Sequence, residues 1–141
     1  MIDTNDLRIG NLILHNKDIV KVTQIVNLNN GYCINGIGLN GYTHYGNVAD
    51  YFEPIPLTEK ILLDCGFKQN RDKWFEINYF TDCKESAEKM GILINLVSNR
   101  CGIIDTDTDE QSAMTANRVY YLHELQNLFY SLTKNELTIN L

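Results

Sequence analysis

The clearest pattern in the chain is an apolar stripe near its C-terminal end. Hydrophobic residues recur there at steps of three and four, the spacing of one face of an amphipathic helix: Val119, Leu122, Leu125, Leu128, Phe129 and Leu132. We therefore predict a helix over residues 119–133 that buries this stripe against a sheet. The other face is polar, and such a face is usually solvated: His123, Glu124, Gln126 and Asn127.

The N-terminal third alternates short apolar segments with polar turns. Residues 7–14, 19–26 and 32–35 are rich in β-branched and other apolar side chains, which is typical of strands. Residues 15–18 and 27–31 hold Asn, Asp and Gly, which favour tight turns. This pattern predicts a small antiparallel sheet, either SH3-like or otherwise curled.

A short helix is predicted after the two prolines of the chain, Pro54 and Pro56. Thr58 is a suitable N-cap because its hydroxyl can accept a backbone N–H of the first turn. Gly66 fits the left-handed residue that commonly follows the last helical turn. The helix is therefore expected between these two residues.

Three further apolar segments, residues 73–80, 91–97 and 101–105, predict more antiparallel strands, the last two forming a hairpin. Residues 81–90 are charged and predict a loop or one helical turn, and the tail at 136–141 could add an edge strand. The resulting order is strands, helix, strands, helix. It favours an α+β fold over an alternating parallel sheet.

The length of 141 residues is that of one ordinary domain and suffices to bury a core. We expect a single domain over 1–141, with a β-rich half at 1–53 and an α+β half at 54–141. Four cysteines are widely spaced and form no Cys-x-x-Cys pair: Cys33, Cys65, Cys83 and Cys101. This spacing predicts free thiols rather than a zinc site or disulfides.

The formal net charge of −6 argues against a nucleic-acid partner, because phosphate backbones favour basic surfaces. Residues 61–110 carry ten acids against six bases, so they could offer a negative surface to a nucleic-acid-binding host protein. The chain has no apolar run of about 18 residues and no hydrophobic leader region, which predicts a cytoplasmic protein without membrane association.

Two sequence motifs resemble ligand-binding patterns, but the first lacks the structural context and the second lacks residues that the chemistry needs. Gly36, Gly38 and Gly41 have the spacing of a dinucleotide-binding loop, but the residues that follow do not predict a helix. Residues 105–109 have the first acidic positions of a calcium loop, but Glu110 replaces the glycine of its sharp turn. We expect neither a cofactor nor a metal, and interpret residues 36–41 as a glycine-rich hairpin or mobile loop.

Catalysis would need a nucleophile beside a base, or paired carboxylates in an apolar site. The histidines His15, His44 and His123 could meet a cysteine in space, but no local signature around the cysteines supports this. We therefore expect that the protein is not an enzyme.

Aromatic and amide side chains gather in and around the glycine loop, where stacking and adaptable hydrogen bonds suit recognition. The alternative is that these rings merely cover the sheet and the proline segment. The candidate binding residues are Tyr32, Asn35, Tyr42, His44, Tyr45 and Tyr51.

Three segments, residues 7–11, 54–67 and 121–133, together resemble a family of small uncharacterised proteins from Bacteroidetes bacteriophages, prophages and related mobile elements. Their order and spacing match over nearly the whole chain, whereas residues 27–52 and 81–112 show no match. The resemblance implies an accessory protein that acts in the bacterial host cytoplasm or is carried in the virion. It implies no activity, cofactor or catalytic residue.

The leading hypothesis is a non-catalytic protein that binds a host or phage macromolecule, with counter-defence as one such role. One alternative is a small-ligand protein that binds or sequesters a nucleotide or signalling nucleotide, since aromatic rings stack on bases. Another is a nucleic-acid-binding module built on the N-terminal sheet, with Lys17 and Lys21 on a strand pair. Exposed aromatics and a strand in the tail would permit a symmetric homodimer.

Overall fold

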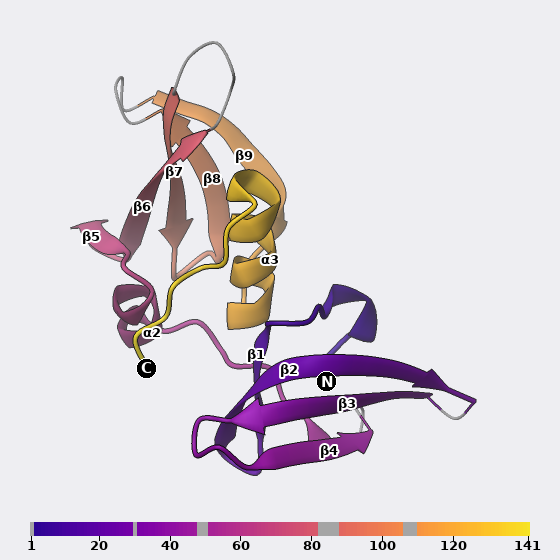
Figure 1. Ribbon diagram of the computed structural model, residues 1–141. Helices are drawn as coiled ribbons and strands as arrows, with labels where there is room; N and C mark the ends of the chain where they lie inside the picture. Colours follow the sequence, from indigo (N-terminus) through magenta and orange to yellow (C-terminus); the bar gives the residue numbers. More distant parts are fainter. Residues whose placement is uncertain (1, 30, 48–50, 82–87, 106–109) are drawn as a thin grey trace. The chain divides into compact units, whose positions relative to one another are not determined.

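The computed structural model describes residues 2–29, 31–47, 51–81, 88–105 and 110–141 (Figure 1). Two antiparallel sheets and two α-helices make up most of their regular structure, so the predicted α+β class is confirmed. No helix within these ranges is long and apolar enough to cross a membrane.

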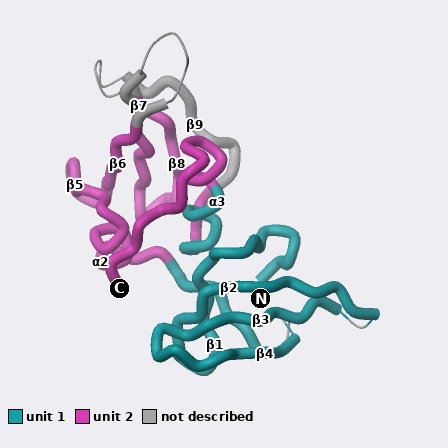
Figure 2. The backbone as a smooth tube through the Cα atoms, in the orientation of Figure 1, with its two compact units in different colours: residues 1–56, 121–127 teal, residues 57–120, 128–141 magenta. Residues whose placement is uncertain are grey.

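The chain divides into two compact units, which Figure 2 shows in teal and magenta. Unit 1 contains residues 1–56 and 121–127, and unit 2 contains residues 57–120 and 128–141. The chain first passes from unit 1 to unit 2 after residue 56, three residues beyond the predicted end of the β-rich half at residue 53. The return of residues 121–127 to unit 1 was not predicted, because an apolar stripe does not reveal which sheet it covers.

Unit 1 is built on a four-stranded antiparallel sheet with the order β1-β2-β3-β4, which confirms the predicted N-terminal curled sheet (Figure 1). A short 3₁₀ helix precedes it, and the elements are η1 (Thr4–Asp6), β1 (Leu12–His15), β2 (Asp18–Leu28), β3 (Gly31–Gly38) and β4 (Thr43–Asn47). The glycine-rich segment forms the hairpin between β3 and β4. A register shift between Val22 and Gln24 interrupts the ladder of β2, a feature that bends a strand.

One face of this sheet carries the core of unit 1. The buried apolar residues of this core are Ile2, Leu7, Ile13, Val20, Val22, Ile34 and Phe52. Gly36 is required within it, since an added Cβ would lie 2.2 Å from the Val20 side chain. Tyr32 is half-buried and packs against the same cluster, so this candidate residue covers the core.

Unit 2 contains a five-stranded antiparallel sheet in sequence order, preceded by a short helix (Figure 1). Its elements are α2 (Glu59–Asp64), β5 (Lys68–Arg71), β6 (Trp74–Thr81), β7 (Glu88–Asn95), β8 (Arg100–Asp105) and β9 (Glu110–Arg118). The predicted strand at 73–80 and the hairpin of β7 and β8 are confirmed. Helix α2 has the predicted N-cap, because the Thr58 hydroxyl accepts the N–H of Ile61 at 3.2 Å.

Three predictions for unit 2 were incomplete or wrong. β5 was not predicted as a strand, because all its residues are polar, yet its backbone pairs with β6. β9 was not predicted, because its sequence lacks the alternation of apolar and polar residues. In the structure it pairs with β8. The tail at 136–141 forms no strand; the N–H of Asn140 donates to the Asp64 carbonyl at 2.9 Å instead.

Part of the predicted loop at 81–90 belongs to strands, since β6 ends at Thr81 and β7 begins at Glu88. Residues 82–87 between them lie outside the described residues. The same holds for residues 106–109, on which the calcium-like motif falls.

Helix α3 (Leu122–Thr133) begins three residues later than predicted. Its apolar stripe is buried most deeply in the first turns, where Leu122 and Leu125 have no exposed surface. Leu128, Phe129 and Leu132 are half-buried, so the prediction that they belong to the core holds only in part.

The polar residues at the start of α3 are not solvated, contrary to our expectation. His123 and Gln126 are only 2% and 3% exposed. The Gln126 side chain accepts the N–H of Leu12 at 2.8 Å and donates to the Gly10 carbonyl at 3.3 Å. The first helical turns are thereby bound to the beginning of β1, within unit 1.

Two asparagines extend this contact. Asn11 is fully buried, and its side chain donates to the Asn127 side-chain oxygen at 2.9 Å while accepting the N–H of Arg8 at 2.8 Å. Asn127 in turn donates to the Asp6 carbonyl. We call Asn11, Gln126 and Asn127 the amide clamp.

Replacing Leu125 with Ala should lower the free energy of unfolding by about 2–5 kcal/mol, because it removes a fully buried side chain and leaves a cavity. Chemical denaturation followed by circular dichroism measures the loss. The control is Leu63→Ala on α2, where the side chain is 49% exposed and the loss should be much smaller. Equal losses of stability in the two variants would contradict the assignment of Leu125 to the core.

Replacing Gln126 with Ala should cost about 1–3 kcal/mol for each buried backbone group that loses its partner. The N–H of Leu12 would be affected most, and hydrogen exchange of that amide measures its protection directly. Gln69→Ala on the exposed strand β5 is the matched control and should leave stability unchanged. Unaltered protection of Leu12 in Gln126→Ala would refute the clamp.

His123 should make unit 1 less stable in mild acid. Burial lowers the pKa of His123 below its ordinary value of 6.5, although Glu124 and Asp6 oppose the shift. As the pH falls below about 6.5, the unfolded chain therefore takes up a proton before the folded chain does, and stability falls. Denaturation at pH 7 and pH 5 should show a larger loss in the wild type than in His123→Gln. Parallel losses would exclude His123 as the cause.

Candidate functional site

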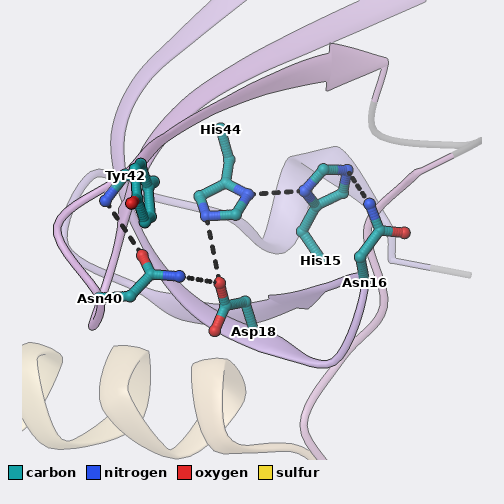
Figure 3. A network of polar contacts seen from close by, with 6 residues as sticks. All are labelled: His15, Asn16, Asp18, Asn40, Tyr42 and His44. Carbon is teal, nitrogen blue, oxygen red and sulfur yellow. Dashed lines mark hydrogen bonds and ion pairs between the residues drawn. The ribbon is translucent and has the colours of Figure 1, made fainter.

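Polar side chains gather in unit 1 where the turn between β1 and β2 approaches β4 (Figure 3). His15 ends β1 and Asp18 begins β2, and the two residues pair across a tight turn. Both central residues of this turn have positive φ, 51° at Asn16 and 70° at Lys17, as in the turns that suit the twist of hairpins. His44 reaches the same place from β4. We call His15, Asp18 and His44 the histidine cluster.

The two imidazole rings of the cluster meet through their Nδ1 atoms, which lie 2.7 Å apart. One ring therefore donates and the other accepts. On its far side, His44 Nε2 lies 3.6 Å from Asp18 Oδ2. The three residues thus form a chain from a carboxylate through one imidazole to a second.

Asn40 holds the carboxylate of this chain in place. Its side-chain nitrogen donates to Asp18 Oδ2, and its oxygen accepts the N–H of Tyr42 at 3.0 Å (Figure 3). Gly38 is required beside this contact, because an added Cβ would lie 2.7 Å from His44 Nε2 and 2.6 Å from the Asn40 oxygen. Because Gly38 has no side chain, the side chains of Asn40 and His44 have room to lie against its backbone.

Aromatic rings surround His15. Its ring lies against Phe52, with centroids 4.9 Å apart, and meets the edge of Tyr51 at 6.3 Å. The Asn16 side chain lies 3.5 Å from His15 Nε2. The His44 side chain is only 13% exposed. The cluster is therefore partly shielded from water.

The cluster resembles a triad in its carboxylate and imidazole, but its third member is His15 rather than a hydroxyl or thiol nucleophile. Imidazole nitrogens are also ligands for borderline transition metals. Within the described part of the chain, no three His, Cys, Asp or Glu side chains are grouped as metal ligands.

Three of the cysteines, Cys33, Cys65 and Cys101, are free and buried. Burial, together with the charge of Asp64, raises the pKa of Cys65 to about 12. A thiol with such a pKa is a poor nucleophile at neutral pH. Cys65 is therefore a core residue of unit 2.

The structure brings three of the six candidate binding residues to the cluster. His44 is a member, the backbone of Tyr42 is bound to Asn40, and the ring of Tyr51 contacts His15. The involvement of His15 and Asp18 was missed, because Asp18 was interpreted as a turn residue and His15 was otherwise considered only as a possible partner of a cysteine. The signal was the Asn-Lys turn between two apolar segments, which places residues 15 and 18 opposite each other, but the approach of β4 could not be foreseen.

Asn35 and Tyr45 lie elsewhere, directly opposite each other on β3 and β4. Paired residues share a face of the sheet, and this face is opposite to the one that carries Ile34 and the core. Asn35 donates to the Gln24 side chain at 2.6 Å. A hydrogen bond with Cys33, and secondarily its charge, raises the pKa of the Tyr45 phenol, which stays protonated at neutral pH.

None of the family models, curated proteins or solved structures compared with this chain matches it. Its function must therefore be inferred from its own residues.

Proposed function

We propose that this protein is a non-catalytic accessory protein of a phage or mobile element that binds a host or phage protein through its β3–β4 hairpin. The resemblance of residues 7–11, 54–67 and 121–133 supports the phage context. A counter-defence role in the bacterial host cytoplasm fits such a protein. The other setting that is consistent with this resemblance is the virion, with the protein as one of its components.

The observation that carries the proposal is the exposure of large apolar and aromatic side chains on the hairpin. Ile37, Leu39, Tyr42 and Tyr45 are 48%, 62%, 71% and 63% exposed. Exposed apolar side chains are usually scattered singly over a protein surface, whereas a gathering of them commonly marks an interaction site. We call these four residues the hairpin surface.

The chemistry of the hairpin surface suits a protein partner. Tyrosine offers a broad apolar face and a hydroxyl and loses little rotamer entropy on binding. Asn35 lies opposite Tyr45 and adds an amide that can exchange hydrogen bonds. A partner that covers these rings would bury most of their exposed area, and buried tyrosines are common hot spots of interfaces.

A nucleotide is the second candidate ligand, because the same tyrosine rings could stack on a base. Lys21 pairs with Ile37 and therefore lies on the same face of the sheet, where it could approach a phosphate. The net charge of −6 disfavours a longer nucleic acid. A protein partner explains the apolar Ile37 and Leu39 better than a nucleotide does.

The test is site-specific photocrosslinking in host cells with a photoreactive amino acid at position 45. The control position is Val97, which is 75% exposed in unit 2. A partner should be crosslinked from position 45 and not from position 97. Crosslinks that occur equally from both positions, or from neither, would refute binding through the hairpin surface.

The partner identified in this way should bind the double variant Ile37→Ala, Tyr45→Ala at least about 30-fold more weakly, since hot-spot truncations cost about 2 kcal/mol or more. Isothermal titration calorimetry measures this affinity, and Val97→Ala should retain that of the wild type. A thermal shift with nucleoside mono- and diphosphates, lost in Tyr45→Ala, would instead support the nucleotide alternative.

A further inference from the structure

The histidine cluster brings two potential metal-ligand atoms to one point. The Nδ1 atoms of His15 and His44 face each other at 2.7 Å. If each ring carries its proton on Nε2, both Nδ1 lone pairs point into the space between the rings. Two imidazoles with both Nδ1 atoms unprotonated would repel each other unless a cation lay between them, whereas without a cation one ring donates its Nδ1 proton to the other.

The surroundings of His44 favour protonation at Nε2, and those of His15 permit it. His44 Nε2 lies 3.6 Å from Asp18 Oδ2 and has no closer hydrogen-bond partner among the described residues. His15 Nε2 lies 3.5 Å from the side-chain nitrogen of Asn16, and a flip of this amide would bring its oxygen there instead. Each remote N–H would then have an oxygen acceptor. Metal-bound histidines almost always have such acceptors, which orient the ring and strengthen the ligand.

We propose that His15 and His44 bind a borderline divalent transition-metal ion such as Zn²⁺ or Ni²⁺ through their Nδ1 atoms, with Asp18 and Asn16 as acceptors for the remote N–H groups. Zinc–imidazole bonds of about 2.0–2.1 Å at a tetrahedral angle need nitrogens about 3.3 Å apart. The two nitrogens, now 2.7 Å apart, would therefore have to separate by about 0.6 Å.

Such an ion would have two protein ligands, and water or an external ligand would fill its remaining positions. Sites with open positions exchange their ligands, whereas structural zinc sites are closed by four protein ligands. On binding, the proton on Nδ1 of the donating ring would move to Nε2 of the same ring, because the ion takes the Nδ1 lone pair. The adjacent carboxylate of Asp18 would offset part of the charge of the ion.

The two histidines of this site lie on the opposite face of the sheet from Ile37 and Tyr45 of the hairpin surface. His44 pairs with Gly36 and lies on the same face as the core residue Ile34, whereas Tyr45 points to the opposite face. Substitutions at the two places can therefore be tested separately.

The experiment is isothermal titration calorimetry of the metal-free full chain with Zn²⁺ and with Ni²⁺. We expect one ion per chain and an affinity at least about 10-fold weaker in His15→Gln and in His44→Gln. Asp18→Asn should weaken binding about 10-fold, the lower end of the effect of losing such an acceptor. His123→Gln, which removes a buried histidine on α3, should bind like the wild type.

Nitrogen NMR of the histidine rings supplies a readout that does not depend on how well the variants fold. In the wild type, Zn²⁺ should leave His15 and His44 protonated on Nε2 and shift their Nδ1 signals. The proposal is overturned by the absence of saturable binding at millimolar metal, by coordination through Nε2, or by an equal loss of affinity in His123→Gln.

Discussion

The amide clamp is the contact on which unit 1 depends. β1 is an edge strand of its sheet, and an edge strand leaves backbone groups without a partner in the ladder. Gln126 binds the N–H of Leu12 and the carbonyl of Gly10, and the backbone of Glu53 pairs with Leu14 farther along the same edge. The edge is thus covered by groups of the chain itself. Because Gln126 is buried, losing these bonds would leave polar groups without water.

The N-terminal sheet separates two kinds of chemistry on its two faces. The period of two along β3 and β4 directs His44 to the face that carries the core and Tyr45 to the other. The first face holds the histidine cluster, where burial and fixed orientation favour coordination. The second presents aromatic rings that suit a partner. The proposed functions can therefore coexist on a hairpin that is short and rich in glycine.

Most strands were predictable, because strands that bury side chains have a recognisable pattern of apolar residues in the sequence. The apolar segments that became β1, β2, β6, β7 and β8 were recognised, and Thr58 and Gly66 bounded α2 as expected. β5 and β9 were missed because backbone hydrogen bonds hold them in their sheet. Their polar side chains form no pattern that would indicate this pairing. Within the candidate site, His44 and Tyr51 were chosen for their residue types alone. His15 and Asp18 could not be chosen, because a turn sequence does not tell which distant strand will approach it.

The sequence by itself determined the α+β class, the position of the main apolar stripe and the caps of α2, since each depends on neighbouring residues along the chain. Tertiary structure alone decided that the polar start of α3 is buried. His123 and Gln126 have the sequence context of a solvated helix face, yet Gln126 bonds to residues more than a hundred positions away. The same holds for the pairing of His15 with His44. Hydrogen bonds between distant residues leave no periodic trace, so only the folded chain reveals them.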